Sequence, residues 1–287
     1  MSKPGNTSGE LLASALVALG NQPPSARLDA ELLLAHALNK PRTRLHAWPE
    51  DPVSAEQAAR YRDLIARRAD GEPVAYLTGR REFWSLSLDV TAQTLIPRPE
   101  TERLVEVALA MIAHGEALTV ADLGTGSGAV AAAIASERPQ CHVIATDACP
   151  RALAVAQANL LRLGIDNVTL RQGNWCEALG EQRCAIIVSN PPYVASGDPH
   201  LSLGDVRYEP RQALSAGQDG LDAIRTITET ARAHLLPGAA LLVEHGHDQG
   251  AAVQGLFRRH GYQNVRGYAD LAGNDRVVGG VAGEALA

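Results

Sequence analysis

Residues 120–129 read Val120-Ala121-Asp122-Leu123-Gly124-Thr125-Gly126-Ser127-Gly128-Ala129. The apolar beginning predicts a buried strand, and the glycines after it predict a tight turn into a helix. Glycine lets the backbone approach a ligand closely, and the first turn of a helix leaves N–H groups free to bind it. The segment therefore predicts an α/β fold with a ligand site at this turn.

The chain from Leu118 onward alternates predicted strands with predicted helices. Strands are expected at 118–123, 141–146, 167–171, 184–189, 238–244, 262–268 and 275–281, and helices at 127–137, 150–163, 221–236 and 247–259. Such alternation is typical of a mainly parallel sheet with helices on both faces. The link at 267–274 is too short for a crossover helix, so the last two strands should pair antiparallel. We expect a Rossmann-like sheet of seven strands.

The chain before residue 80 predicts a small helical bundle. Apolar stripes at helical spacing run along 11–19 and 30–38. A third helix should begin at Ser54, where Glu56 and Gln57 stand near the N3 position of a capping box. The bundle should therefore contain three helices.

A hairpin and a linker should join this bundle to the sheet. Residues 82–90 alternate apolar and polar side chains as a strand or hairpin arm does, and a proline-punctuated connection and a helix at 101–113 follow. We place the domain boundaries at 1–80, 81–115 and 116–287.

Composition excludes several classes of protein. The 287 residues are 46% hydrophobic and 20% charged, as in soluble globular proteins. A net charge of −6 gives no electrostatic footprint for nucleic-acid phosphates. There is no apolar run of about 18 residues, and the start, Met1 to Glu10, is polar, so we expect a cytoplasmic protein without a membrane span. The cysteine and histidine spacings predict reduced thiols and no metal site.

Arginines gather late in the helical part of the chain. They are Arg60, Arg62, Arg67, Arg68, Arg80 and Arg81. Charge runs on surface helices usually face solvent. The alternative is a docking surface for an acidic or nucleic-acid-bearing partner.

The glycine turn alone leaves the ligand open. Gly124-x-Gly126-x-x-Ala129 matches the dinucleotide fingerprint, and Asp147 stands where its acidic ribose anchor is expected. These features suit NAD and S-adenosylmethionine equally. Asp122 favours the second, because a carboxylate repels a pyrophosphate but suits an ammonium and a sulfonium. Both acids have a second interpretation, as caps for turns or helices.

Asn190-Pro191-Pro192-Tyr193 follows the apolar run 184–188 and predicts a rigid polar corner at the end of a buried strand. The prolines fix φ, and Pro191 biases Asn190 toward an extended conformation. Tyr193 adds an aromatic wall. This corner suits a planar amine or amide, whose N–H groups need acceptors. Asn174 and Trp175 follow the third strand, where they could contact an adenine, or Trp175 could simply pack.

These motifs resemble the seven-stranded class I S-adenosylmethionine methyltransferases. Within that class, Asn-Pro-Pro-Tyr resembles the motif of enzymes that methylate nucleic-acid base amines or glutamine amides. Further segments are similar to the peptide chain release factor glutamine methyltransferases of the HemK or PrmC type. These segments are 76–79, 82–83, 96–102, 208–214, 217–227 and 244–246.

The resemblance implies methyl transfer from S-adenosyl-L-methionine to the glutamine of the Gly-Gly-Gln motif in class I release factors, with S-adenosyl-L-homocysteine as product. It implies a substrate-docking role for the helical domain, a monomer, and no stable nucleic-acid binding. The implied cofactor contacts are Asp122, Gly124, Thr125, Gly126, Ser127, Gly128, Asp147, Asn174, Trp175 and Asn190, and the implied catalytic corner is Asn190, Pro191, Pro192 and Tyr193.

The chain departs from the family pattern at two positions. Asn174 replaces an acidic residue, so the charged contact to the adenine amine is open here. Cys149 stands where a capping Ser is usual, which should weaken that helix cap.

Glutamine methylation requires that a poor nucleophile be oriented. We expect the Asn190 side-chain oxygen and the Pro191 carbonyl to accept the two amide hydrogens, with Tyr193 over the amide plane and no general base. Glu100 and Glu244 are further candidates for shaping the site. The main alternative is a DNA or RNA base-amine methyltransferase. An NAD-dependent oxidoreductase and a non-catalytic binding protein fit the motifs less well.

Overall fold

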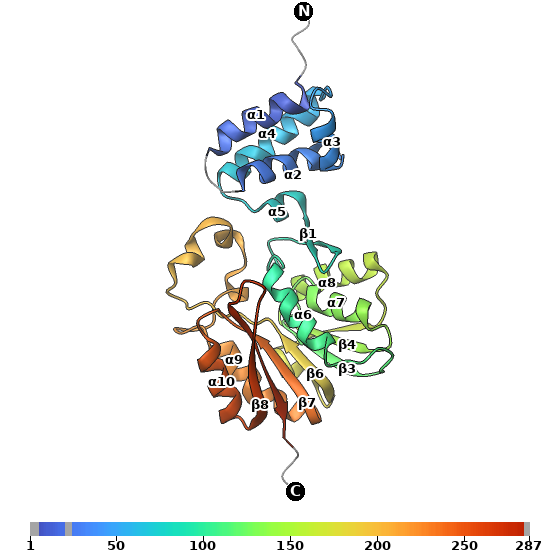
Figure 1. Ribbon diagram of the computed structural model, residues 1–287, viewed down its shortest axis with the longest axis vertical. Coiled ribbons are helices and arrows are strands. Elements are labelled where there is room, and N and C mark those ends of the chain that lie inside the picture. Colours follow the sequence, from blue (N-terminus) through green and yellow to red (C-terminus); the bar gives the residue numbers. More distant parts are fainter. Residues whose placement is uncertain (1–5, 21–24, 284–287) are drawn as a thin grey trace, which may run out of the picture. The chain divides into compact units, whose positions relative to one another are not determined.

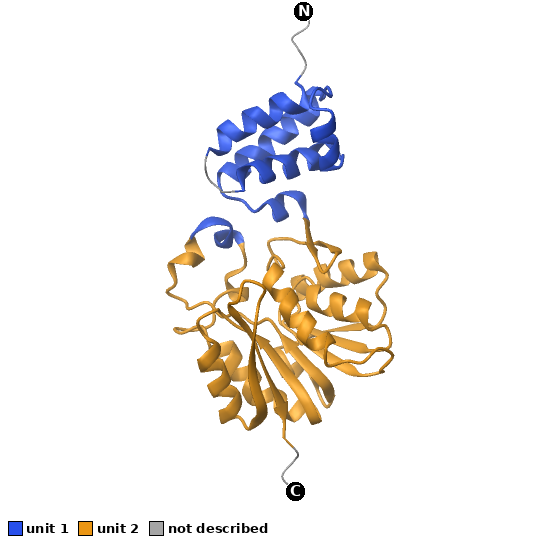
Figure 2. Ribbon diagram, viewed as in Figure 1, with its two compact units in different colours: residues 1–79, 203–208 blue, residues 80–202, 209–287 orange. Residues whose placement is uncertain are grey.

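The computed structural model describes residues 6–20 and 25–283. Residues 1–5, within the polar start from Met1 to Glu10, lie outside this part. The chain forms two compact units, one of residues 1–79 with 203–208 and one of residues 80–202 with 209–287 (Figure 2). Each unit has its own core and is described by itself.

The first unit is a bundle of helices (Figure 1). Its helices are α1 (Ser8–Leu19), α2 (Ala26–Leu38), α3 (Arg42–Ala47), α4 (Ala55–Ala69) and α5 (Val74–Thr78). The predicted start of the third long helix is confirmed, because Ser54 and Gln57 form a reciprocal capping box before α4. The short α3 and α5 were not predicted, since five or six residues cannot display a helical stripe.

The bundle core contains both apolar packing and one buried ion pair. Leu33, Leu34 and Tyr61 are almost completely buried between the helices. Arg68 is also buried, and it donates to Asp29 at 2.8 Å and to Asp205, in the segment 203–208, at 2.6 Å. A late segment of the chain thus completes the unit that the first 79 residues build.

The second unit begins with the predicted hairpin, formed by β1 (Arg80–Phe83) and β2 (Leu86–Asp89). A 3-10 turn (Pro99–Thr101) then leads into α6 (Glu102–Leu109). The prediction that this helix reaches residue 113 was wrong. The amides of Met111 and Ile112 bond to carbonyls three residues back, which tightens the last turn and ends the helix.

Seven strands form the predicted sheet, which confirms the fold class. They are β3 (Thr119–Leu123), β4 (His142–Asp147), β5 (Val168–Gln172), β6 (Cys184–Ser189), β7 (Leu235–Glu244), β8 (Tyr262–Ala269) and β9 (Asp275–Ala282). Their order is β5-β4-β3-β6-β7-β9-β8, and all pairs are parallel except those made by β9. The antiparallel pairing of the last two strands was correctly predicted.

Helices cover both faces of this sheet (Figure 1). They include α7 (Ala129–Glu137), α8 (Pro150–Leu163), α9 (Asp222–Thr230) and α10 (Gly250–Arg259). One buried cluster contains apolar residues of α6 and α7, and a second contains those of α9 and α10. Alternate residues of β3 belong to different clusters, because successive side chains of a strand point to opposite faces.

Three predicted helix boundaries were wrong. The helix expected at 221–236 ends at Thr230, and β7 begins at Leu235 rather than at 238. Leu235 pairs with Cys184 across a register shift, so Leu236 and Pro237 lie within the strand instead of before it. The helices expected from 127 and 247 begin at 129 and 250. Gly128 has a φ of 83°, outside the helical region, and a turn at 246–249 precedes α10.

Candidate active site

The glycine turn and the Asn-Pro-Pro-Tyr corner lie at the same edge of the sheet. β3 pairs in parallel with β4 on one side and β6 on the other, so the strand order reverses there, and Leu123 lies opposite Ser189. Open α/β sheets bind ligands at such switch points. A cavity of about 430 Å³ opens there, with walls from the glycine turn, the end of β4 and the corner after β6. Its lining includes Asp122, Gly124, Thr125, Gly126, Ser127, Asp147, Asn190 and Pro192.

The glycine turn needs glycine for its backbone. Gly124, Gly126 and Gly128 have φ values of 75°, 58° and 83°, which side chains other than glycine rarely adopt. A Cβ at Gly124 would lie 3.1 Å from the Trp175 ring, and one at Gly128 would lie 3.2 Å from the Ala156 Cβ. A Cβ at Gly126 would meet no atom of the described chain within 4 Å. The turn is therefore packed from behind and open at Gly126.

Asp122 both lines the cavity and holds the turn. One of its oxygens accepts from the Thr125 hydroxyl at 2.6 Å and from the Ala131 amide at 3.2 Å. Burial raises the pKa of this carboxyl to about 6, although the two hydrogen bonds lower it. The turn-capping interpretation of Asp122 thus describes a real contact, which coexists with a position in the cavity wall.

Asp147 also contacts the glycine turn. Its Oδ2 accepts from the Gly126 amide at 2.9 Å, and its Oδ1 accepts from the Cys149 amide at 2.8 Å. The carboxylate therefore joins the end of β4 to the glycine turn and to the start of α8. It lies in the cavity wall at the position expected of the ribose anchor.

Five predicted site residues do not line this cavity. One of them is Tyr193, which packs against the second core cluster. Gly128 packs on α8, and Trp175, with a φ of 44°, packs against Gly124 and the second core cluster. Asn174 precedes the 3-10 turn 175–179, also outside the cavity lining of the described chain. Pro191 lies inside the corner rather than on the cavity wall.

The corner after β6 presents a buried acceptor. Asn190 Nδ2 donates to Thr101 Oγ1 at 3.1 Å. Asn190 Oδ1 is buried and has no hydrogen-bond partner within residues 6–20 and 25–283. Because buried polar atoms are almost always paired, this oxygen marks a place where a donor is missing.

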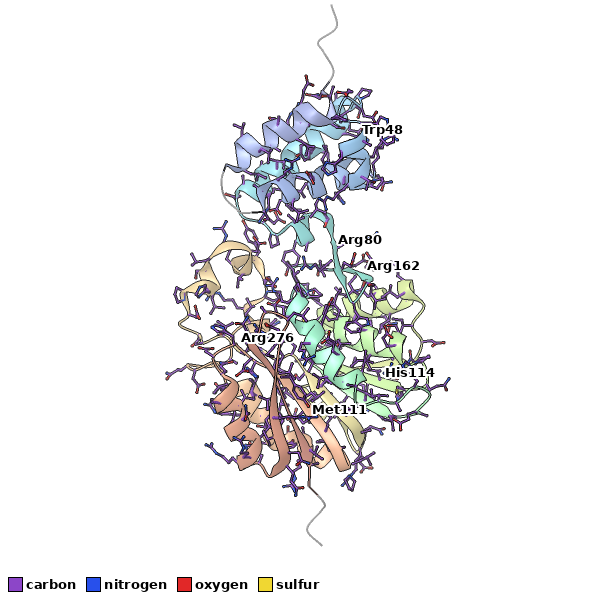
Figure 3. The ribbon with its side chains drawn as sticks, viewed as in Figure 1. Trp48, Arg80, Met111, His114, Arg162 and Arg276 are labelled. Carbon is purple, nitrogen blue, oxygen red and sulfur yellow. The ribbon has the colours of Figure 1, made fainter. Side chains whose placement is uncertain are left out.

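Glu244 lies behind the corner at the end of β7 and is completely buried. Its Oε1 accepts from the Tyr193 hydroxyl at 3.4 Å. Its Oε2 has no hydrogen-bond partner in the described part of the chain. Burial raises the pKa of this carboxyl to about 7, while Thr101, Arg276 and Tyr193 lower it. Arg276 comes from the start of β9 (Figure 3), next to the end of β7.

A glutamine side chain fixes the backbone of the corner. Gln249 Nε2 donates to the Tyr193 carbonyl at 3.0 Å and to the Asp219 carbonyl at 3.2 Å. Its Oε1 accepts from the Gly246 amide at 2.9 Å. Gln249 therefore holds three loops together, and sequence reasoning did not find it.

A buried acid joins two loops that border the cavity. The Glu209 side chain pairs with Arg98 and accepts from the Ile96 amide at 3.0 Å. Pro97 and Pro210, beside these residues, line the cavity. The only signal for Glu209 was its position in a segment that resembles the family.

The predicted arginine cluster is mostly engaged in local contacts. Arg62 donates to Asn6, Arg67 pairs with Glu72, and Arg68 is buried with two acids. Arg81 donates to the Pro97 carbonyl in the second unit. These contacts pair much of the positive charge of the arginine cluster within the chain, so the cluster does not require an external partner to explain it.

Two further features concern the described residues only. No group of three or more metal-ligating side chains lies together among them. None of their helices is long and apolar enough to cross a membrane.

Two family models match this chain. Residues 10–79 match the PrmC N-terminal domain, and residues 101–206 match the methyltransferase small domain. A release factor glutamine methyltransferase of Pseudomonas aeruginosa is 54% identical over 255 residues, which is 89% of this chain and 92% of that protein. One of Escherichia coli is 48% identical over 254 residues, or 88% and 91%.

Solved structures bear out the fold. A methyltransferase of Pyrococcus furiosus superposes with a TM-score of 0.53 at 20% identity, covering 76% of this chain and 97% of that one. At this identity the likeness concerns the fold alone.

Proposed function

The chain belongs to the family of release factor glutamine methyltransferases, and on this premise we propose how its cavity carries out the reaction. It transfers a methyl group to the side-chain amide nitrogen of the glutamine in the Gly-Gly-Gln motif of class I release factors. The observation that carries the proposal is Asn190 Oδ1, a buried acceptor without a partner in the described chain, at the wall of the cavity. A primary amide supplies the missing donor.

The residues of the cavity fit S-adenosyl-L-methionine. The volume of about 430 Å³ is within the usual range for cofactor sites. Asp122 and Asp147 offer carboxylates of the kind that suit an ammonium and ribose hydroxyls, and the open side of Gly126 leaves room for close approach. When bound, this cofactor supplies an electrophilic methyl group.

The corner orients the glutamine nitrogen. Its lone pair is delocalised into the carbonyl, so it attacks only when it is aimed. Asn190 Oδ1 and the Pro191 carbonyl accept the two N–H groups, and Tyr193 covers the amide plane. Holding reactants in this way is worth on the order of 7–11 kcal/mol. No general base is required, because the methylated amide is acidic and releases its proton afterwards.

We further propose roles for the helical unit and for Trp175. The helical unit docks the release factor, and the enzyme acts as a monomer in the cytoplasm, without stable nucleic-acid binding. Trp175 contributes to the cofactor site through the backbone position of the glycine turn, since it packs on Gly124, and Asn174 precedes it in the chain.

Mass spectrometry of a release factor incubated with the enzyme and S-adenosyl-L-methionine tests this function. We expect the Gly-Gly-Gln peptide to gain one methyl group, and a release factor with alanine in place of that glutamine to gain none. Methylation of RNA or DNA with an unchanged release factor would support the base-amine alternative instead.

A further inference from the structure

Three buried or half-buried polar groups lie at one end of the cavity, and each comes from a different segment. Asn190 and Thr101 line the cavity, and Glu244 does not. Asn190 follows β6, Thr101 closes the 3-10 turn before α6, and Glu244 ends β7. Thr101 and Glu244 are 4% and 0% exposed, so water does not compete for their contacts. Asn190 Nδ2 donates to Thr101 Oγ1, and the Thr101 hydroxyl lowers the pKa of Glu244.

A hydroxyl group has a single proton, so its direction determines what else it can bind. A carboxylate only accepts, and Glu244 Oε2 is buried without a partner in the described chain. If Thr101 gives its proton to Glu244, its lone pairs remain for a donor. The only donor end of the Asn190 side chain is its NH₂ group, which then faces Thr101, and Oδ1 faces the cavity.

We propose that Glu244, acting through Thr101, fixes the orientation of the Asn190 amide so that its oxygen faces the substrate. Thr101 and Glu244 are positioning residues in this scheme and do not touch the glutamine. The inference rests on the proposed role of Asn190 as the acceptor for the glutamine N–H.

The orientation depends on the charge of Glu244. A protonated carboxyl can donate to Thr101 Oγ1, which frees the Thr101 proton to turn toward Asn190. The Asn190 amide can then rotate and present NH₂ to the cavity. The Asn190 NH₂ group then faces the NH₂ group of the substrate glutamine. This contact is unfavourable, because both groups are hydrogen-bond donors.

Other charged or titratable groups also face Glu244. Arg276 from β9 favours its ionised form, while Glu100 from the 3-10 turn opposes it. Tyr193 donates to it and stays protonated, because burial raises the pKa of its phenol above the ordinary value. Burial lowers the pKa of the neighbouring His245, which favours the neutral imidazole. With burial raising the pKa of Glu244 to about 7, the orientation should be lost as pH falls through neutrality.

Thr101→Val and Thr101→Ser form a matched pair for the test. Valine keeps the shape of threonine but has no hydroxyl, whereas serine keeps the hydroxyl. We expect Thr101→Val to lose at least about tenfold in kcat/KM for the release factor, equal to ~1.4 kcal/mol. Thr101→Ser should retain most of it. Melting temperature and the Kd for S-adenosyl-L-homocysteine should stay close to wild type in both, which shows that the fold is intact.

The preference of the enzyme for glutamine over glutamate in the release factor provides a second measurement. A purely structural role of Thr101 would not change this preference. A release factor with glutamate in place of the glutamine offers acceptors, so wild-type enzyme should bind it more weakly than the glutamine form. In Thr101→Val the amide can present NH₂, and the preference measured by competition should shrink or reverse. In Glu244→Gln, the fall of kcat/KM between pH 8 and pH 6 should flatten.

Equal losses in the valine and serine variants, or an unchanged preference and pH profile, would overturn the inference. Both results leave the proposed function standing, provided that wild-type enzyme methylates the release factor. If wild-type enzyme does not, the proposed function itself fails.

Discussion

Gly220 is predicted to control activity although it lies outside both motifs. A Cβ at this position would stand 2.2 Å from the Tyr193 carbonyl oxygen and 2.9 Å from Gln249 Nε2, where ordinary contacts begin at 3.4 Å. Gly220→Ala must therefore push the Tyr193 carbonyl away by roughly 1 Å. Pro191 and Pro192 are stiff, so the displacement should reach Asn190.

The size of the effect follows from this displacement. A misplacement of about 1 Å at a reacting group can cost on the order of 100-fold in rate. Gly220 also has a φ of 75°, which adds strain of roughly 1–2 kcal/mol for alanine. Gly238, with a φ of 77° and no atom of the described chain within 4 Å of its Cβ position, provides the matched control.

Steady-state kinetics with a release factor measure the loss of rate from the displaced carbonyl, and thermal melts measure the loss of stability, to which backbone strain contributes. Both variants have the same backbone strain, and Gly220→Ala should lose more stability because it also displaces the Tyr193 carbonyl. Only Gly220→Ala should lose kcat, with its affinity for S-adenosyl-L-homocysteine preserved. A difference in kcat/KM below about tenfold between the two variants, or ~1.4 kcal/mol, would refute the reasoning.

Three further predictions concern buried charges. Glu209→Gln should weaken S-adenosyl-L-homocysteine binding in calorimetry, because its pair with Arg98 holds two loops of the cavity; unchanged affinity would count against this. Glu244→Gln should raise the melting temperature at pH 8 but not at pH 4. Because the pKa of Glu244 is raised, its neutral carboxyl contributes up to ~3 kcal/mol to the free energy of unfolding below about pH 4.5. This contribution is lost as pH rises through about 7. Arg68→Ala should cost about 3–5 kcal/mol in unfolding experiments, because it leaves buried Asp29 unpaired, whereas the exposed Arg67→Ala should cost no more than about 1 kcal/mol. Equal losses in these two arginine variants would contradict the burial argument.

Local patterns predicted much of the fold. The glycine turn, the alternation of strands and helices, and the short link before β9 were sufficient for the seven-stranded sheet. The capping box at Ser54 placed the start of α4. Boundaries failed where tertiary pairing overrides local signals. The predicted strand began after Pro237, but the register shift opposite Cys184 keeps Pro237 inside β7.

The candidate site was predicted in part for the same reason. Asn190 and Asp147 belong to short motifs whose spacing is visible in the chain. Thr101, Glu209 and Gln249 act through partners that are 89, 113 and 56 residues away, and no local pattern connects such distant positions. Trp175 could be read as a stacking residue, whereas its ring supports the glycine turn from behind.

The turnover of Asn190→Ala tests the central claim most directly. Asn190 Oδ1 is the buried acceptor to which the account assigns the glutamine N–H. We predict that the variant folds, binds S-adenosyl-L-homocysteine, and nearly loses methyl transfer to the Gly-Gly-Gln glutamine. A folded variant that keeps more than about a tenth of the wild-type rate, a loss below ~1.4 kcal/mol, would contradict it.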